Sequence, residues 1–194
     1  LNEIAKGNET AKSLTEHLFG MGEIYSPTHS VLNFTSNHDE NSWQGDVFER
    51  LGSAAEVLSV LTYVMPGMPL IYGGQEFGLD KRLDFFEKDL IEKKDSPFLS
   101  LFTKLNKLKE INSALDVGDK PGGFNVLETV DDEVLGILRS KSNDSIVFYA
   151  NLSPNAKVIS LENFSGFSNI FTENKTSSTH QLINSSTHQL INSS

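Results

Sequence analysis

The chain has 194 residues, a formal net charge of −10 at pH 7, a pI of about 4.9 and no cysteine. This acidic balance argues against nucleic acid and anionic membranes as partners, because both attract a basic surface. No apolar run approaches the roughly 20 residues of a membrane-spanning helix. The lack of cysteine excludes disulfides and thiolate metal sites and leaves the redox compartment open.

The first predicted helix spans residues 1–19, where apolar residues recur at helical spacing and two glycines follow. Residues 31–35 are mostly bulky or β-branched, which predicts a buried strand. A polar cluster at 37–41 follows, and then Trp43, the only tryptophan of the chain. Carboxylates, an imidazole and amides after an apolar strand are typical of a barrel strand that presents chemistry at its C-terminal end.

A second helix is predicted from Asp46, which is expected to serve as its N-cap. Glu49, three residues later, would complete a capping box. The apolar residues of this helix share one face, as a helix that covers a barrel requires. They are Phe48, Leu51, Ala55, Leu58 and Leu61.

The prolines at 66 and 69 are expected to end that helix and to start a short buried strand at 70–72. The glycine pair 73–74 allows a sharp turn. Residues 75–76 should then emerge on the same rim as the polar cluster of the first strand, because the strands of such a barrel are parallel.

The charged stretch 81–95 is expected to form the long loop after this strand. Pro97 starts the clearest helix of the chain, which is predicted to extend to residue 115 with a regular apolar face. Gly118 and the turn at 121–123 mark a domain boundary.

After this boundary the apolar period changes to two, which predicts an antiparallel β-domain with turns rich in Asp, Asn and Ser. The expected strands are 124–130, 134–139, 146–152 and 157–161.

The end of the chain is a polar repeat, in which residues 178–185 recur identically as 186–193. Two copies are too few for a repeat fold, and this composition is expected to remain disordered. The predicted domains are therefore a barrel portion at 1–117, a β-domain at 118–171 and a low-complexity tail at 172–194.

Two motifs resemble the α-amylase family, glycoside hydrolase family 13. Phe34–Asp39 resembles the signature of that family at barrel strand 7, and Met65–Glu76 resembles strand 8 and the loop after it. The resemblance implies the last two strands and helices of a (β/α)8 TIM barrel followed by an incomplete antiparallel β-sandwich. It identifies the chain as the C-terminal part of a bacterial-type α-amylase, whose partner is the remaining N-terminal part of its own barrel.

The resemblance also assigns roles in the cleavage of α-1,4-glucosidic bonds of starch-like glucans or maltooligosaccharides. Asp39 is expected to stabilise the positively charged transition state, and His38 to donate a hydrogen bond to the sugar. Asn37 and Trp43 are expected to contact substrate, although a lone tryptophan is at least as often a packing residue. The competing interpretation of Asp39 is a loop residue that caps a turn.

In the family, charged residues of the loop after strand 8 lie near the glucan, so Arg82 and Asp84 are candidates for sugar contacts. The alternative for this loop is a solvated face with two aromatic residues tucked beneath it. The nucleophile and the acid of this retaining mechanism lie on strands 4 and 5, which precede Leu1, so the isolated chain is predicted to be inactive. The Ca²⁺ site of the family also lies mostly upstream, and no cofactor or metal ligand is predicted here.

Three alternatives stay open. A sister activity on the same barrel, such as that of an α-glucosidase, a branching enzyme or a glucanotransferase, would differ in upstream loops. The chain could instead act as a non-catalytic glucan-binding module. A metallohydrolase site at 37–40 would need further ligands at suitable spacing, and no other strand end supplies them.

Overall fold

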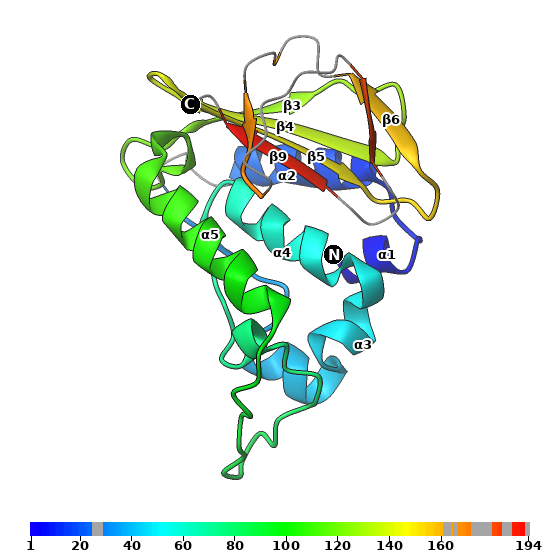
Figure 1. Cartoon of the computed structure of the whole chain (residues 1–194), viewed down its shortest axis with the longest axis vertical. Helices are drawn as coiled ribbons and strands as arrows, with labels where there is room; N and C mark the ends of the chain where they lie inside the picture. The colour runs from blue at the N-terminus through cyan, green and yellow to red at the C-terminus, as the bar shows by residue number, and fades with distance from the viewer. Residues whose placement is uncertain (25–28, 161–163, 165–166, 172–179, 184–187, 193–194) are drawn as a thin grey trace.

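The computed structural model of the protein describes residues 1–24, 29–160, 164, 167–171, 180–183 and 188–192. Helices α4 and α5 lie against one side of an antiparallel sheet, and the segment that leads into α5 extends to the end of the molecule farthest from that sheet (Figure 1). The loop before α5 therefore lies far from the β-domain.

The helices alternate with short strands in the first half of the chain, and strands dominate the second half. The α-helices are α1 (Asn2–Ala5), α2 (Ala11–Ile24), α3 (Val47–Leu51), α4 (Ala55–Val64) and α5 (Pro97–Ile111). The shorter 3-10 or π turns are η1 (Glu40–Gln44), η2 (Gly52–Ala54), η3 (Gln75–Phe77) and η4 (Ser113–Leu115). The strands are β1 (Leu32–Asn33), β2 (Met68–Pro69), β3 (Gly123–Leu127), β4 (Val134–Lys141), β5 (Asp144–Asn151), β6 (Lys157–Ser160), β7 (Ser168–Asn169), β8 (His180–Ile183) and β9 (His188–Asn192).

The N-terminal segment contains two helices, so the prediction of a single helix over 1–19 is wrong in its bounds. Gly7 adopts a φ of +74°, which ends α1. Thr10 and Ser13 then exchange hydrogen bonds, with the Ser13 amide donating to Thr10 Oγ1 at 3.3 Å and the Thr10 amide to Ser13 Oγ at 3.0 Å. Helix α2 continues through Gly20, since a helical glycine costs only about 1 kcal/mol relative to alanine.

Strands β1 and β2 pair in parallel, as the sequence predicts. The second strand lies at 68–69 rather than 70–72, because the amides of Met68 and Leu70 donate to carbonyls of the β1 segment, both at 2.8 Å. Pro69 lies between these two donors and needs no amide there. Leu32 is 60% exposed, so the expectation of a buried strand is wrong at this residue, because β2 is the only sheet neighbour of β1 in the described residues.

The helix after the first strand begins with the predicted capping box. Asp46 Oδ1 accepts hydrogen bonds from the amides of Phe48 and Glu49 at 2.8 and 3.1 Å, and Glu49 Oε2 accepts from the Asp46 amide at 2.8 Å. The single helix expected here is interrupted at Gly52, which has a φ of +53°. This break lets α3 and α4 take different directions (Figure 1).

The main sheet has the order β3-β4-β5-β9-β7, with antiparallel pairing throughout. Successive residues of β4 and β5 alternate between two apolar layers. Leu135, Ile137 and Phe148 face the helices, whereas Val134 and Val147 pack with β6 on the other side. The predicted antiparallel β-domain is therefore present, and both of its faces are covered.

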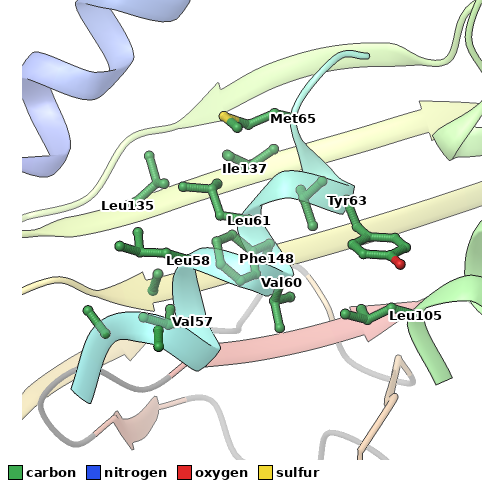
Figure 2. Packing of buried hydrophobic residues seen from close by; sticks show 14 of the residues in the cluster. Val57, Leu58, Val60, Leu61, Tyr63, Met65, Leu105, Leu135, Ile137 and Phe148 are labelled. Atoms are coloured by element: carbon green, nitrogen blue, oxygen red, sulfur yellow. The ribbon is translucent and has the colours of Figure 1, made fainter. Parts of the chain in front are cut away.

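One buried cluster joins the helices to the sheet, with α4 at its centre (Figure 2). Leu58 and Leu61 of α4 lie beside Ile137 and Phe148 of the sheet, whereas Tyr63 points toward Leu105 of α5. Burial of such side chains stabilises the fold by about 1.5–3 kcal/mol each. The proposed division near residue 117 stays a prediction, since this core contains residues from both sides of it.

Arg139 of β4 ties the two halves together. It is 1% exposed and donates to the carbonyls of Val64 at 2.7 Å, Gly123 at 2.9 Å and Gly122 at 3.3 Å. The Val64 carbonyl belongs to the last turn of α4, where carbonyls lack helical partners and attract positive charge. Burial lowers the pKa of Arg139 to about 10.

The tail differs from the expectation of disorder in two described segments. Strand β8 pairs with β6, and strand β9 pairs with both β5 and β7. The two strands come from the two copies of the repeat. The physical reason is that the backbones of β5 and β6 offer strand edges whose hydrogen bonds a polar segment can satisfy.

Candidate functional site

The polar cluster after β1 folds into η1, a single π-helical turn. Asn37 Oδ1 accepts the Glu40 amide at 2.7 Å at its start, and the Gly45 amide donates to the Glu40 carbonyl at 3.0 Å at its end. Such turns are frequent at functional sites because they redirect neighbouring side chains. Asn37 therefore has a local structural role, with its amide nitrogen left for other contacts.

His38 and Asp39 lie directly before this turn and are open to solvent. Their side chains are 66% and 64% exposed, and His38 Nε2 lies 3.5 Å from Asp39 Oδ2. The Asp39 carboxylate accepts no capping hydrogen bond from η1. The two side chains are thus adjacent and accessible, as a role in ligand contact requires.

Asn41 and Ser42 connect this turn to the loop after β2. Asn41 is 2% exposed, and its side-chain amide donates to the Lys81 carbonyl at 3.0 Å and accepts the Leu83 amide at 2.7 Å. Ser42 Oγ donates to the Leu83 carbonyl at 2.8 Å. These bonds fix the backbone on both sides of Arg82 against η1.

An aromatic cluster lies beside Asp39. The ring of Phe85 lies 5.8 Å from His38, 5.3 Å from Trp43 and 4.8 Å from Phe86 between centroids. Trp43 is 57% exposed and Phe86 83%. The alternative of two aromatic residues tucked beneath the loop is therefore wrong for Phe86, whereas Phe85 is 38% exposed and packs among the other rings.

Arg82 and Asp84 behave differently from each other. Arg82 Nε donates to Glu49 Oε2 at 2.9 Å, so its guanidinium is committed to the first turn of α3. This bond also lowers the pKa of Glu49 and raises that of Arg82. The Asp84 side chain is exposed, and its backbone amide donates to Asp89 Oδ2 at 3.2 Å. Both sugar-binding assignments stay predictions.

Gln75 is buried and joins the ends of the two strands. Its Nε2 donates to Thr35 Oγ1 at 2.6 Å, and its Oε1 accepts the Tyr72 amide at 3.2 Å. Glu76 Oε2 accepts the Gly74 amide at 2.9 Å. Gln75 therefore braces the end of the β1 segment, as its predicted place on the rim requires, and Glu76 holds the turn that precedes it.

Arg50 is a further rim residue that the sequence analysis misses. It donates to the carbonyls of Thr35 at 2.6 Å and Gly45 at 2.9 Å, and it pairs with Glu40 Oε2 at 3.2 Å. Burial lowers the pKa of Arg50, and the Glu40 carboxylate partly offsets this. A lone arginine inside a predicted helix gave no signal of this role.

Within the described residues, no group of three or more His, Asp or Glu side chains is arranged to hold a metal ion. The helices in the same part of the chain include none with the length and apolar character needed to cross a membrane.

Comparisons with known proteins find α-amylases and a glucanotransferase among the similar proteins, although no family model matches the chain. The α-amylase MalA of Haloarcula japonica is 27% identical over 163 residues, which cover 83% of this chain and 24% of that protein. The crystal structure of an α-amylase from Lactobacillus plantarum has a TM-score of 0.75 at 17% identity and covers 98% of this chain and 44% of that one. The cyclomaltodextrin glucanotransferase CldA also has a TM-score of 0.75, at 16% identity, covering 98% and 42%.

The resemblance to the α-amylase family that the two motifs indicate is confirmed by these relatives. The fold class is confirmed as well: the last strands and helices of a (β/α)8 barrel, followed by an antiparallel β-domain. The chain spans about a quarter of the curated relative and less than half of these solved structures.

Proposed function

We propose that this chain forms the substrate-contacting rim of a glycoside hydrolase that cleaves α-1,4-glucosidic bonds in starch-like glucans with retention of configuration. The observation that carries this proposal is the pair His38 and Asp39, exposed and adjacent at the end of a barrel strand. The sequence similarity to an α-amylase supports the substrate class.

In this function Asp39 supplies negative charge where the reaction needs it. Glycoside cleavage passes through an oxocarbenium-like transition state, and a fixed carboxylate beside it lowers the barrier without being consumed. His38 donates a hydrogen bond to a hydroxyl of the same sugar. The braces made by Arg50 and Gln75 hold the strand end in place, so little reorganisation is needed during the reaction.

The nucleophile and the general acid come from earlier strands of the barrel in this proposal. The 194-residue chain alone should therefore release no reducing sugar from soluble starch. Release above a matched blank by the purified chain would contradict this assignment of the chemistry.

Binding can be tested on the chain itself, because Trp43 is its only tryptophan. Maltoheptaose should change Trp43 fluorescence in a saturable way, whereas a cello-oligosaccharide of equal length should not. Asp39→Ala should weaken this binding, and Glu16→Ala, an exposed change on α2, should leave it unchanged. Absence of any maltoheptaose binding would end the proposal.

Transglycosylation is a second candidate, because the glucanotransferase CldA matches the fold as well as the α-amylase does. The two activities share the intermediate and differ in whether water or a sugar hydroxyl accepts the glucosyl group. Product analysis of the enzyme with its complete barrel decides between them: cyclic or elongated glucans favour transfer, and short linear sugars favour hydrolysis.

A further inference from the structure

The loop between η3 and α5 has a closed base and an exposed tip. Asp89 closes the base, since its Oδ1 accepts Lys81 Nζ at 2.6 Å and the Leu90 amide at 2.7 Å, and its Oδ2 accepts the Asp84 amide at 3.2 Å. The hydrogen bond from the Lys81 ammonium makes the largest contribution to the lowered pKa of Asp89. The tip between these contacts contains Phe85 and Phe86.

Asn41 holds this closed loop against η1. Both polar atoms of its buried side chain are used, one on the Lys81 carbonyl and one on the Leu83 amide. A buried amide that satisfies two backbone groups stabilises one loop position over others, because losing it leaves those groups unpaired. Phe85 is thereby placed with its ring 5.3 Å from that of Trp43.

The result is a continuous aromatic surface made of His38, Trp43, Phe85 and Phe86. Exposed aromatic rings held by a rigid frame are costly to leave in water, and they mark a surface for ligand contact. The chain carries a net charge of −10, and His38, Phe85 and Phe86 are each followed or preceded in the chain by an acidic residue: Asp39, Asp84 and Glu87. The cations of the same loop, Lys81 and Arg82, are paired with Asp89 and Glu49. This excess of negative charge disfavours an anionic ligand and suits a neutral one with apolar C–H faces, such as a glucose ring.

We propose that Phe85 and Phe86 extend the sugar-contacting surface of Trp43, so that the site binds a run of glucose units, and that Asn41 is the residue that positions them. This inference rests on the proposed function, since the run begins at the unit that contacts Asp39. In this inference the preference for longer glucans depends on Phe85 and Phe86 at the loop tip and not on Asp39.

The test measures binding of maltose, maltotriose, maltopentaose and maltoheptaose to the chain by calorimetry. Affinity of the wild type should rise with length. Phe86→Ala should weaken maltoheptaose binding by roughly threefold to tenfold and leave maltose binding unchanged, because one aromatic contact is lost. Phe19→Ala is the matched control, since Phe19 is 57% exposed on α2 and outside this surface.

Asn41→Ala has its own readout, which does not depend on sugar. Release of the loop should expose Trp43, shift its emission to the red and make acrylamide quenching faster before any ligand is added. The same variant should lose the length dependence although Asn41 contacts no sugar. If Asn41→Ala fails to fold, Phe85→Ala and Phe86→Ala still test the surface.

The outcomes separate the two proposals. If the wild type binds the sugars and Phe85→Ala and Phe86→Ala show the same dependence on chain length, the inference about the loop tip is overturned. The proposed function is not affected by that result. No binding by the wild type ends both. Concentration-dependent sedimentation that Phe86→Ala abolishes, with sugar affinity unchanged, would instead make the surface a contact between copies of the chain and overturn the inference.

Discussion

The centre of the molecule and its rim are held together by different forces. Around α4 the contacts are apolar, and Val57, Leu58, Val60, Leu61 and Val64 are each 0% exposed. At the rim the side chains of Arg50, Asn41 and Gln75 hold backbone segments through hydrogen bonds. The apolar contacts of the core stabilise the fold in proportion to the buried area. The hydrogen bonds of the rim fix the positions of its loops.

This difference explains why the rim can expose His38, Asp39 and Trp43. Loops that are fixed by backbone hydrogen bonds do not need to bury their own apolar groups. The side chains at their tips are then free to contact a ligand. Substitutions in the core should therefore change stability, and substitutions at the rim should change binding and rate.

The largest expected effect is in the core. Phe148→Ala should lower the free energy of unfolding by about 3–5 kcal/mol, because the ring is fully buried between the sheet and α4. Urea unfolding measures this loss. Val130→Ala is the control with almost no expected change, since Val130 is fully exposed. A loss below about 1 kcal/mol for Phe148→Ala would show that the sheet and the helices do not share one core.

The next effect is in rate and should leave stability unchanged. In the enzyme with its complete barrel, Asp39→Asn should lower kcat roughly 100- to 1,000-fold, equivalent to about 2.7–4 kcal/mol of transition-state stabilisation. The melting temperature should stay constant, since Asp39 is 64% exposed and caps no turn. Steady-state kinetics beside a thermal melt separates the two quantities. A near-normal kcat would remove the catalytic role of Asp39, and Glu16→Gln serves as the charge-matched control.

The comparison of core and rim also shows what the sequence can predict. The capping box of Asp46 and Glu49 follows from two residues three positions apart, and the apolar face of α5 follows from its period. The parallel pairing of β1 and β2 follows from the two motifs. The first two features are each encoded within a short stretch, and the third follows from a pair of recognisable motifs.

The features that sequence reasoning misses depend on residues far apart in the chain. The position of Phe85 is fixed through Asn41, which lies 40 residues before its partner Lys81. Arg139 reaches the Val64 carbonyl across 75 residues. The breaks at Gly7 and Gly52 depend on a positive φ that a glycine permits but does not require. No local pattern contains this information.

A pH-dependent effect of intermediate size should appear in the core. Burial raises the pKa of Tyr63 to about 12 from an ordinary value near 10. Its contribution to stability is therefore complete below about pH 10 and is lost as the pH rises to about 12, an upper limit of about 2.7 kcal/mol at about 1.36 kcal/mol per pKa unit. The advantage of the wild type over Tyr63→Phe should shrink across this window in urea unfolding.

Arg139 is the other buried ionisable group of this core, and burial lowers its pKa. It is present in both the wild type and Tyr63→Phe, so its contribution to the pH dependence of stability cancels in their difference. A difference that stays constant from pH 9 to 12 would show that Tyr63 ionises as if it were exposed.

The smallest expected effect is that of the exposed pair between Glu49 and Arg82. Glu49→Gln keeps a side chain that can complete the capping box with Asp46, because Gln accepts the same amide. The substitution removes only the charge that Arg82 Nε meets at 2.9 Å. Both side chains are about half exposed, so water and salt screen their attraction and little stability should depend on it.

Salt dependence decides how this pair acts. At low ionic strength Glu49→Gln should lower the melting temperature slightly, and near 1 M salt, where the Debye length is about 3 Å, the difference from the wild type should vanish. Glu49→Ala is the comparison, because it also breaks the capping box and should lose more stability at every salt concentration. Equal losses of stability in Glu49→Gln and Glu49→Ala would show that Glu49 contributes only through its contact with Arg82. Its hydrogen bond to the Asp46 amide would then add no stability to the first turn of α3.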